Sequence, residues 1–275
     1  MPVLRPLPKT ELNSFFSDHS LKVFQHFMNV ALFAQPEVHK DKDGLAIQIP
    51  KEHLEQWFVQ ALKVESVGAG SYPIDILAPT RWGADIKMLS CNLKNDKLTK
   101  RDSGETSLAQ KFTGTGVDLD KMFKDKEFQA IIDGWLGLWH KKLEDVKIEK
   151  EIDKIYYFFF LRGTTTESYL CGFEVDTNRI NTTHVTQRDA DDEIKSSIFL
   201  NGIINEDYGS SKIYKAKKRL ELRLKPKKLL EDNFLIPIKT QIPSKENIYN
   251  LVQDKTKYNT YIKSKCSNFL DYSKL

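Results

Sequence analysis

The chain has few cysteines and histidines, and their positions give no support to several common kinds of site. Its three cysteines, Cys91, Cys171 and Cys266, are odd in number and far apart in the 275 residues. Neither a disulfide framework nor a zinc site follows from that spacing. The six histidines are scattered as well, so neither a histidine metal site nor a Ser-His-Asp arrangement is indicated.

Neither a signal peptide nor an apolar run of membrane-spanning length is visible in the sequence, and neither charge is in strong excess. We therefore expect a soluble, cytoplasmic protein without a membrane partner. The net charge of +4 permits nucleic acid as a partner but does not require it. A hydrophobic content of 40% is enough for a substantial core in one large domain or two small ones.

Two short stretches, residues 72–77 and 83–89, alternate apolar and non-apolar side chains. A period of two predicts strands that each bury one face. In the first stretch, Ile74 and Ile76 are predicted to share one face of the strand, with Asp75 on the other.

A turn over residues 79–83 would make these strands a hairpin, because the segment contains proline and glycine. Asp75 would then lie opposite Asp85 as a cross-strand pair. Lys87, two residues after Asp85, would point from the same face. The pattern thus predicts two carboxylates and an ammonium group on one small patch.

This patch has a chemical interpretation. Two neighbouring aspartates repel each other unless a cation lies between them. Hard oxygen ligands suit Mg²⁺, which takes one or two carboxylates and keeps several waters for substrate phosphates. Lys87 could orient or deprotonate a metal-bound water, or stabilise charge on a phosphate. The predicted chemistry is hydrolysis of a phosphodiester by a metal-activated water. The alternative is an ordinary hairpin with an incidental surface cluster.

These residues also carry a family resemblance. Pro73-Ile-Asp75, nine intervening residues and then Asp85-Ile-Lys87 resembles the PD-(D/E)xK signature of restriction-endonuclease-like nucleases, with Ile74 as an extra residue between proline and aspartate. The resemblance implies an α/β (α+β) fold in which helices flank a mixed central β-sheet. It implies that Asp75, Asp85 and the backbone carbonyl of Ile86 hold the metal, with Lys87 as a catalytic residue.

Nucleases of this kind often donate a further acidic residue from the helix before the first catalytic strand. A helix predicted over residues 51–64 supplies Glu55 as the first choice, and Glu65 at its end as the second. The alternative for either residue is a solvated helix carboxylate.

The remaining pattern predicts one nuclease domain over residues 1–275. Residues 1–150 would carry the N-terminal helices and the catalytic hairpin, and residues 151–275 the sheet extension and the DNA contacts. Apolar periodicity predicts helices over 11–34 (with a break near 18–20), 106–112 and 128–146, and strands over 155–161 and 168–175.

Residues 212–228 are strongly basic: nine of the seventeen are Lys or Arg, and one is acidic. Leu220, Leu222 and Leu224 alternate there with charged residues, which predicts a strand with one charged face. A cationic strand of this kind fits a phosphate backbone, and the alternative is a solvated charged face. The predicted DNA-binding residues are Lys217, Lys218, Arg219, Arg223 and Lys225.

Together these observations favour a Mg²⁺-dependent, sequence-specific endonuclease of double-stranded DNA, most like a type II restriction enzyme acting as a homodimer. One alternative is a DNA repair or junction-resolving nuclease of the same fold. The other is a non-catalytic nucleic-acid-binding protein in which the Asp/Asp/Lys patch is incidental.

Overall fold

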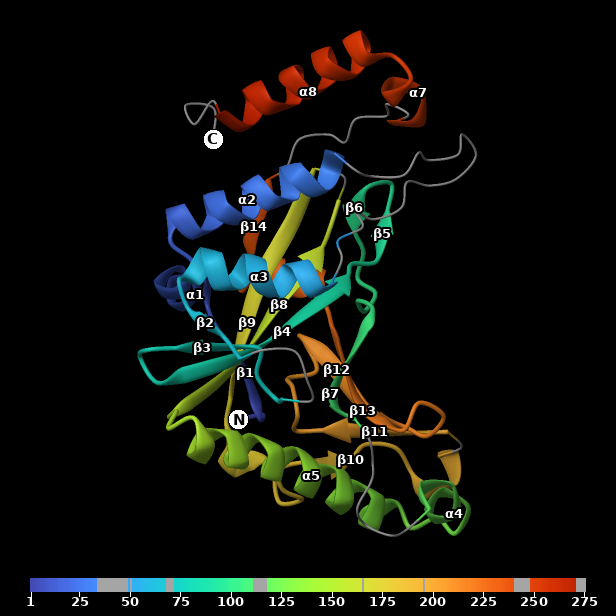
Figure 1. Ribbon diagram of the computed structural model, residues 1–275. Coiled ribbons are helices and arrows are strands. Elements are labelled where there is room, and N and C mark those ends of the chain that lie inside the picture. Colours follow the sequence, from blue (N-terminus) through green and yellow to red (C-terminus); the bar gives the residue numbers. More distant parts are fainter. Residues whose placement is uncertain are drawn as a thin grey trace.

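A computed structural model describes residues 1–33, 49, 51–67, 72–110, 118–164, 166–194, 196–239 and 248–270. Its central sheet has the strand order β1-β9-β8-β4-β3-β2, and β14 pairs with β9 as well (Figure 1). β4 and β8 are parallel and the other pairs are antiparallel, so the sheet is mixed, as predicted. The strands are β1 (Leu4–Pro6), β2 (Glu65–Ser66), β3 (Ile76–Ala78), β4 (Trp82–Ser90), β8 (Lys154–Arg162), β9 (Glu167–Val175) and β14 (Ile236–Lys239).

The two predicted strands over 155–161 and 168–175 are confirmed as β8 and β9. Residues 155–161 are apolar at every position because β8 is buried on both faces of the sheet. Phe158 and Phe160 pack into a cluster on one face, while Tyr157 and Phe159 join a cluster on the other. β8 therefore connects the two halves of the core.

Three helices cover the first face of the central sheet: α1 (Lys9–Phe15), α2 (Asp18–Phe33) and α3 (Lys51–Leu62). The predicted helices over 11–34 and 51–64 are confirmed in type, and the predicted break falls at residues 16–17. Aromatic rings from this helical layer pack around Phe158; those of Phe16 and Phe58 lie 5.1 and 6.2 Å from its ring centroid. The aromatic richness of the N-terminal segment is thus explained by packing.

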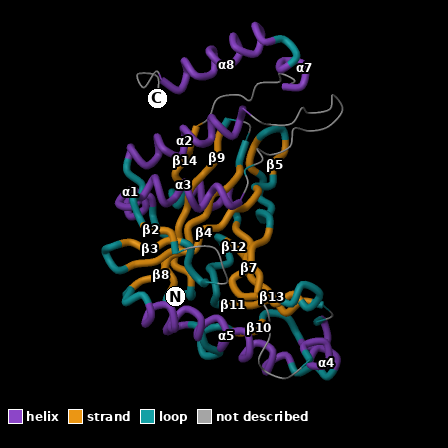
Figure 2. Tube along the Cα trace, in the orientation of Figure 1, coloured by secondary structure: helices purple, strands orange, loops and turns teal. Residues whose placement is uncertain are grey.

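The second face is covered by α5 (Phe128–Glu149), as predicted over 128–146, and by a second, antiparallel sheet (Figure 2). Trp135 and Trp139 of α5 are almost completely buried and belong to the same apolar cluster as both sheets. The second sheet has the order β10-β11-β12-β13-β7. Its strands are β7 (Glu105–Gln110), β10 (Thr186–Gln187), β11 (Ser197–Asn201), β12 (Gly209–Tyr214) and β13 (Arg219–Leu224).

The helix predicted over residues 106–112 is wrong. Its described part lies in β7, which pairs antiparallel with β13 through a register shift between Leu220 and Glu221; residues 111 and 112 lie outside the described residues. A segment this short has no decisive period, and the free edge of β13 determines its conformation through hydrogen bonds.

The other elements lie around this two-sheet core. They comprise β5 (Leu93–Lys94), β6 (Lys97–Leu98), α4 (Leu119–Lys124), α6 (Pro226–Glu231), α7 (Ile248–Val252), α8 (Lys255–Leu270) and two 3₁₀ turns, Thr177–Arg179 and Asp191–Glu193. None of the helices in the described ranges is long and apolar enough to cross a membrane.

Candidate functional site

The β3–β4 hairpin brings Asp75 alongside Asp85. Ile76 lies opposite Ala84 in the antiparallel register. The residue before Ile76 is Asp75 and the residue after Ala84 is Asp85, so the two aspartates are neighbours. The Asp75 N–H donates to the Ala84 carbonyl at 2.8 Å, and the Ile86 N–H donates to Asp75 Oδ2 at 2.6 Å. Asp75 is therefore bonded to both residues that flank Asp85, which is the juxtaposition expected from the sequence.

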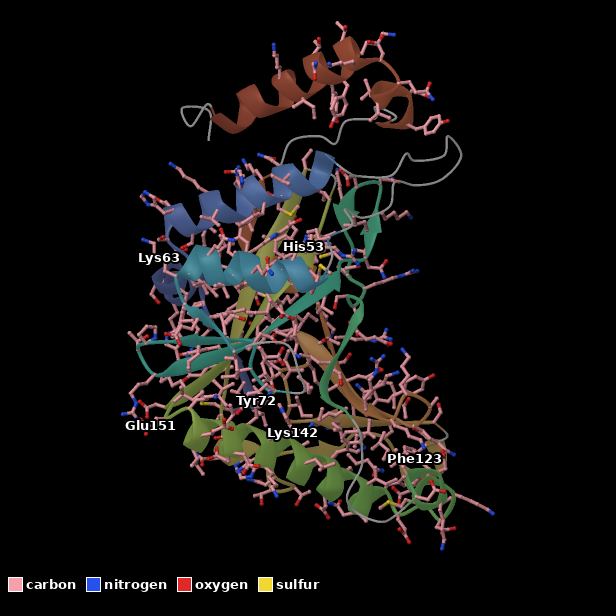
Figure 3. The ribbon with its side chains drawn as sticks, in the orientation of Figure 1. His53, Lys63, Tyr72, Phe123, Lys142 and Glu151 are labelled. Carbon is pink, nitrogen blue, oxygen red and sulfur yellow. The ribbon has the colours of Figure 1, made fainter. Side chains whose placement is uncertain are left out.

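The first strand of the hairpin is shorter than predicted. β3 begins only at Ile76, and the chain bends at Asp75. The prediction that Ile74 and Ile76 share a face is wrong, because Ile74 packs in the cluster on the α5 side and Ile76 in the cluster under α1–α3. Tyr72, labelled in Figure 3, lies near the end of α5, with its ring centroid 5.2 Å from Lys150 Nζ. The chain thus changes sides of the sheet at Asp75.

Gly83 makes room for this crossing. A Cβ atom at position 83 would lie 2.7 Å from Ile74 Cδ1 and 3.0 Å from Ile152 Cδ1. Ile74 is fully buried and directly precedes Asp75. The absence of a side chain at position 83 of β4 therefore leaves room for Ile74, and the buried Ile74 side chain holds Asp75 in place.

We expect Gly83→Ala to destabilise the protein by about 1–3 kcal/mol, because a methyl group would overpack this contact. Gly137→Ala is the matched control: nothing lies within 4 Å of its added Cβ, and it sits inside α5. That substitution should stabilise the protein by about 0.5–1 kcal/mol. Urea unfolding of both variants measures the difference, and a Gly83→Ala variant as stable as wild type would contradict this account.

Lys87 is held by the same strand. It is 8% exposed, and its Nζ lies 2.6 Å from Asp85 Oδ2. The nitrogen also lies 5.2 Å from the ring centroid of Tyr157, the β8 residue paired with Asp85. The Tyr157 hydroxyl accepts a hydrogen bond of 2.8 Å from Trp139 Nε1. The buried side chain of Tyr157 from β8 thus packs beside the Lys87 ammonium group, and Trp139 from α5 holds the Tyr157 hydroxyl.

Sequence reasoning missed Tyr157 and Trp139 as parts of this site. Both lie in apolar stretches that predict core positions, and both are almost completely buried. A tyrosine inside a strand that is otherwise apolar is a weak signal that a polar contact is present. Only the parallel register of β4 and β8 reveals which polar group it meets.

The electrostatics of the site centre on Asp75. Burial raises the pKa of Asp75 to about 7, and the neighbouring Asp85 carboxylate adds to the rise. The hydrogen bond from the Ile86 N–H opposes that rise in pKa, as does the charge of Lys87 more weakly. Glu55 of α3 raises the pKa too, so this carboxylate lies within electrostatic reach of the site.

The two candidate glutamates are placed differently. Glu55 lies on α3 and is half-buried, on the helix that precedes the hairpin. The prediction that Glu65 lies at the end of this helix is wrong: α3 ends at Leu62, and Lys63 takes a left-handed conformation with φ of 54°. Glu65 lies in β2, exposed and opposite Leu77. Of the two, Glu55 is therefore the one whose charge acts on Asp75.

The oxygen donors of the site fit a metal ion that needs few ligands from the protein. Within the described ranges, no group of three or more His, Cys, Asp or Glu side chains is arranged to hold one. Mg²⁺ requires fewer protein ligands, because water and phosphate oxygens complete its shell. The Ile86 N–H faces Asp75, and a strand residue's carbonyl points to the same edge as its N–H. Two carboxylates and this carbonyl are hard oxygen donors that fit Mg²⁺.

The basic segment forms β12, β13 and the turn between them. Leu220, Leu222 and Leu224 are fully buried, which confirms a strand with one apolar face. Lys217 and Lys218 lie in the turn before β13, and Lys225 follows it, with its Nζ bonded to the Glu206 backbone oxygen.

The charged face of β13 differs from the predicted one, because carboxylates neutralise part of it. Glu105 of β7 contacts Lys217, and it lies 3.0 Å from Arg219 and 2.7 Å from Arg223. Glu221 is 1% exposed and accepts from Arg219 Nε at 2.8 Å. The sequence analysis predicted a helix in place of most of β7, and it therefore did not predict that Glu105 contacts these cations.

Comparison with known proteins identifies no relative. No protein-family model matches the chain, and no curated protein or solved structure matches it. The interpretation of the site therefore depends on its own geometry and chemistry.

Proposed function

We propose that this protein is a Mg²⁺-dependent endonuclease that hydrolyses phosphodiester bonds of double-stranded DNA. The proposed class is the PD-(D/E)xK restriction-endonuclease-like nucleases, and within it a sequence-specific type II restriction enzyme. The observation that carries the proposal is the approach of Asp75, the residue before β3, to Asp85 and Lys87 of β4: the Ile86 N–H donates to Asp75 Oδ2 at 2.6 Å, and Lys87 Nζ lies 2.6 Å from Asp85 Oδ2. The mixed sheet between helical layers is compatible with such a core.

Each side chain has a role in the proposed reaction. Asp75, Asp85 and the Ile86 carbonyl would hold Mg²⁺, which when bound supplies an activated water and offsets charge on the scissile phosphate. Lys87 positions the attacking water and stabilises the developing negative charge. The ring of Tyr157 limits the positions open to the Lys87 ammonium, because the ring lies against it. Glu55 adds negative charge that favours a bound cation.

The second sheet is the proposed source of DNA contacts. Lys217, Lys218, Arg219, Arg223 and Lys225 remain the proposed phosphate-binding residues, with Glu105 and Glu221 holding three of them in place. We further propose a homodimer, because a two-fold axis in the protein matches the symmetry of a palindromic duplex.

The direct test is digestion of plasmid DNA with and without metal. We expect cleavage with Mg²⁺ and intact plasmid with EDTA in its place. Discrete fragments on a gel would indicate a restriction enzyme. Cleavage confined to junctions or lesions would instead indicate the repair or junction-resolving alternative. Intact DNA in Mg²⁺, across substrates of different sequence and structure, would refute the nuclease proposal and leave a nucleic-acid-binding protein.

A further inference from the structure

The outer face of the second sheet carries a set of side chains that the proposed cleavage reaction does not use. Every second residue of β11, β12 and β13 faces the core: Ile198, Leu200, Ile213, Leu220 and Leu222 are all between 0 and 5% exposed. Glu221, between the last two, is also 1% exposed, but it is paired with Lys212 and Arg219. The residues between them must point away from the core, because successive side chains of a strand face opposite ways.

Two aromatic residues lie on this outer face. Phe199 of β11 is paired with Lys212 of β12, and Tyr214 lies two residues after Lys212 on the same face. Phe199 and Tyr214 are therefore diagonal neighbours, about 7–8 Å apart and within reach of one another's side chains. Both are half-buried rather than part of the core. The outer face of the second sheet thus presents two neighbouring aromatic rings.

Cations surround the two rings. The Arg188 guanidinium lies 4.5 Å from the centroid of Phe199, and Lys212 Nζ lies 4.4 Å from the centroid of Tyr214. Lys217, in the turn that follows β12, places its Nζ 5.5 Å from the centroid of Tyr214. These cations lie over the rings, so a base that stacks on a ring must displace its cation, which then stays close enough to bind the phosphate attached to that base.

The charge of β12, β13 and the turn between them is positive even after their ion pairs are counted. Lys212, Lys215, Lys217, Lys218, Arg219 and Arg223 share three carboxylates, those of Glu105, Asp120 and Glu221. Arg188 is paired separately with Asp189 at 3.3 Å. The surplus of positive charge favours a polyanionic partner. The rings of Phe199 and Tyr214 favour a partner that carries flat, apolar groups between its negative charges.

We propose that the outer face of the second sheet binds unpaired nucleotides of a single-stranded nucleic acid. Bases stack on Phe199 and Tyr214, and Arg188, Lys212 and Lys217 contact the phosphates. Bases in an intact duplex are stacked on one another and cannot lie on a flat sheet face, so this surface requires unpaired ones. The proposal goes beyond cleavage of duplex DNA. Of the side chains named here only Lys217 is also a proposed duplex contact, although Arg219 and Arg223 of that set lie on the same face of β13.

Fluorescence anisotropy in EDTA, where metal-dependent cleavage is prevented, tests the proposal. The probes are labelled oligo(dT) and oligo(U), an equally long DNA duplex as comparison, and heparin as a polyanion without bases. We expect wild type to bind one or both single strands at least about tenfold more tightly than the duplex. The two single strands separate a DNA ligand from an RNA ligand. Heparin-like or duplex-like affinity would overturn the proposal.

Phe199→Leu and Tyr214→Leu should each weaken single-strand binding by about tenfold, because a leucine keeps apolar volume but removes the stacking surface. Tyr214→Phe, which keeps the ring, should bind as wild type does. Tyr249→Leu is the matched control, since Tyr249 is an exposed aromatic on α7. Unchanged affinity in both leucine variants would overturn the proposal, as would an equal loss in Tyr249→Leu.

Photocrosslinking of wild type covers the case in which a leucine variant does not fold. An oligonucleotide carrying 4-thiouridine should crosslink to peptides that contain Phe199 or Tyr214. Crosslinks found only elsewhere would refute the assignment of the surface. Neither the anisotropy nor the crosslinking measurement requires cleavage. A protein that cuts plasmid but fails both measurements would refute only the single-strand binding. A protein that passes both measurements but never cuts DNA would refute only the proposed nuclease activity.

Discussion

Lys87→Ala is expected to lower the rate of Mg²⁺-dependent DNA cleavage by about a hundred- to a thousandfold, the usual loss when a group that stabilises developing charge is removed. DNA affinity should change by less than about threefold, because a lysine that is 8% exposed contributes little to the surface potential. Single-turnover cleavage and anisotropy with the same duplex in Ca²⁺ or EDTA measure the two quantities separately.

Lys147→Ala is a suitable control for that experiment. Lys147 is also a partly buried lysine in an ion pair, 3.0 Å from Glu144, but it belongs to α5 and lies outside the Asp75–Asp85–Lys87 patch. It should leave cleavage within about twofold of wild type. Lys87→Met preserves the apolar stem and checks that loss of activity does not come from unfolding. If Lys87→Ala loses binding and cleavage together, or loses neither, the catalytic assignment of Lys87 is wrong.

Asp75→Asn should have opposite effects on activity and on stability. Cleavage should fall by at least about a hundredfold, because an amide is a much poorer ligand for Mg²⁺ than a carboxylate. At pH 8 without metal the variant should be more stable than wild type by about 1–2 kcal/mol, because it removes a buried charge close to Asp85. The amide oxygen of the substituted side chain can still accept the hydrogen bond that the Ile86 N–H donates in wild type.

The pH dependence of this stability difference has a definite sign. The pKa of Asp75 is raised to about 7 in the folded protein, while an unfolded aspartate titrates near 3.9. Between these values the folded state binds more protons than the unfolded state, so the contribution of Asp75 to stability falls as pH rises from about 4 to about 7. The stability gain of Asp75→Asn should therefore grow across that window and level off above it.

Urea unfolding at several pH values, with and without Mg²⁺, measures this prediction. Mg²⁺ should stabilise wild type at pH 8 and have little effect on Asp75→Asn, because ligand binding to the folded state stabilises it by mass action. Asp153→Asn is the control, since that carboxylate is 67% exposed and paired with Arg81 on the surface. A variant that is less stable than wild type at pH 8 would contradict the raised pKa of Asp75, and one that gains equally from Mg²⁺ would contradict its metal-ligand role.

The local pattern of the sequence was sufficient for the elements with strong periodicity. The apolar run of 155–161 predicts a strand buried on both faces, and β8 has this environment. The spacing of Asp75 and Asp85 about a short turn predicts their juxtaposition, and the hydrogen bonds of Asp75 to Ala84 and Ile86 place it beside Asp85. These predictions succeed because a single strand or hairpin is determined by neighbours in the chain.

Other features depend on groups that are distant in the chain. Residues 105–110 form a strand because β13 offers them an edge, and this places Glu105 against Arg219 and Arg223. No local pattern indicates that these cations are already paired. The same reason explains Tyr157, whose contact with Lys87 exists only because β4 and β8 are parallel and in register.

The amino-acid sequence by itself determined the two carboxylates, the lysine and the hairpin that brings them together, since all of these lie within thirteen residues, 75–87, of one another. Only the tertiary structure decided that Ile74 and Ile76 lie on opposite sides of the sheet, that Glu55 rather than Glu65 acts on Asp75, and that carboxylates hold the basic strand. The physical reason is that charge interactions and packing act through space, whereas periodicity reports only on neighbours along the chain.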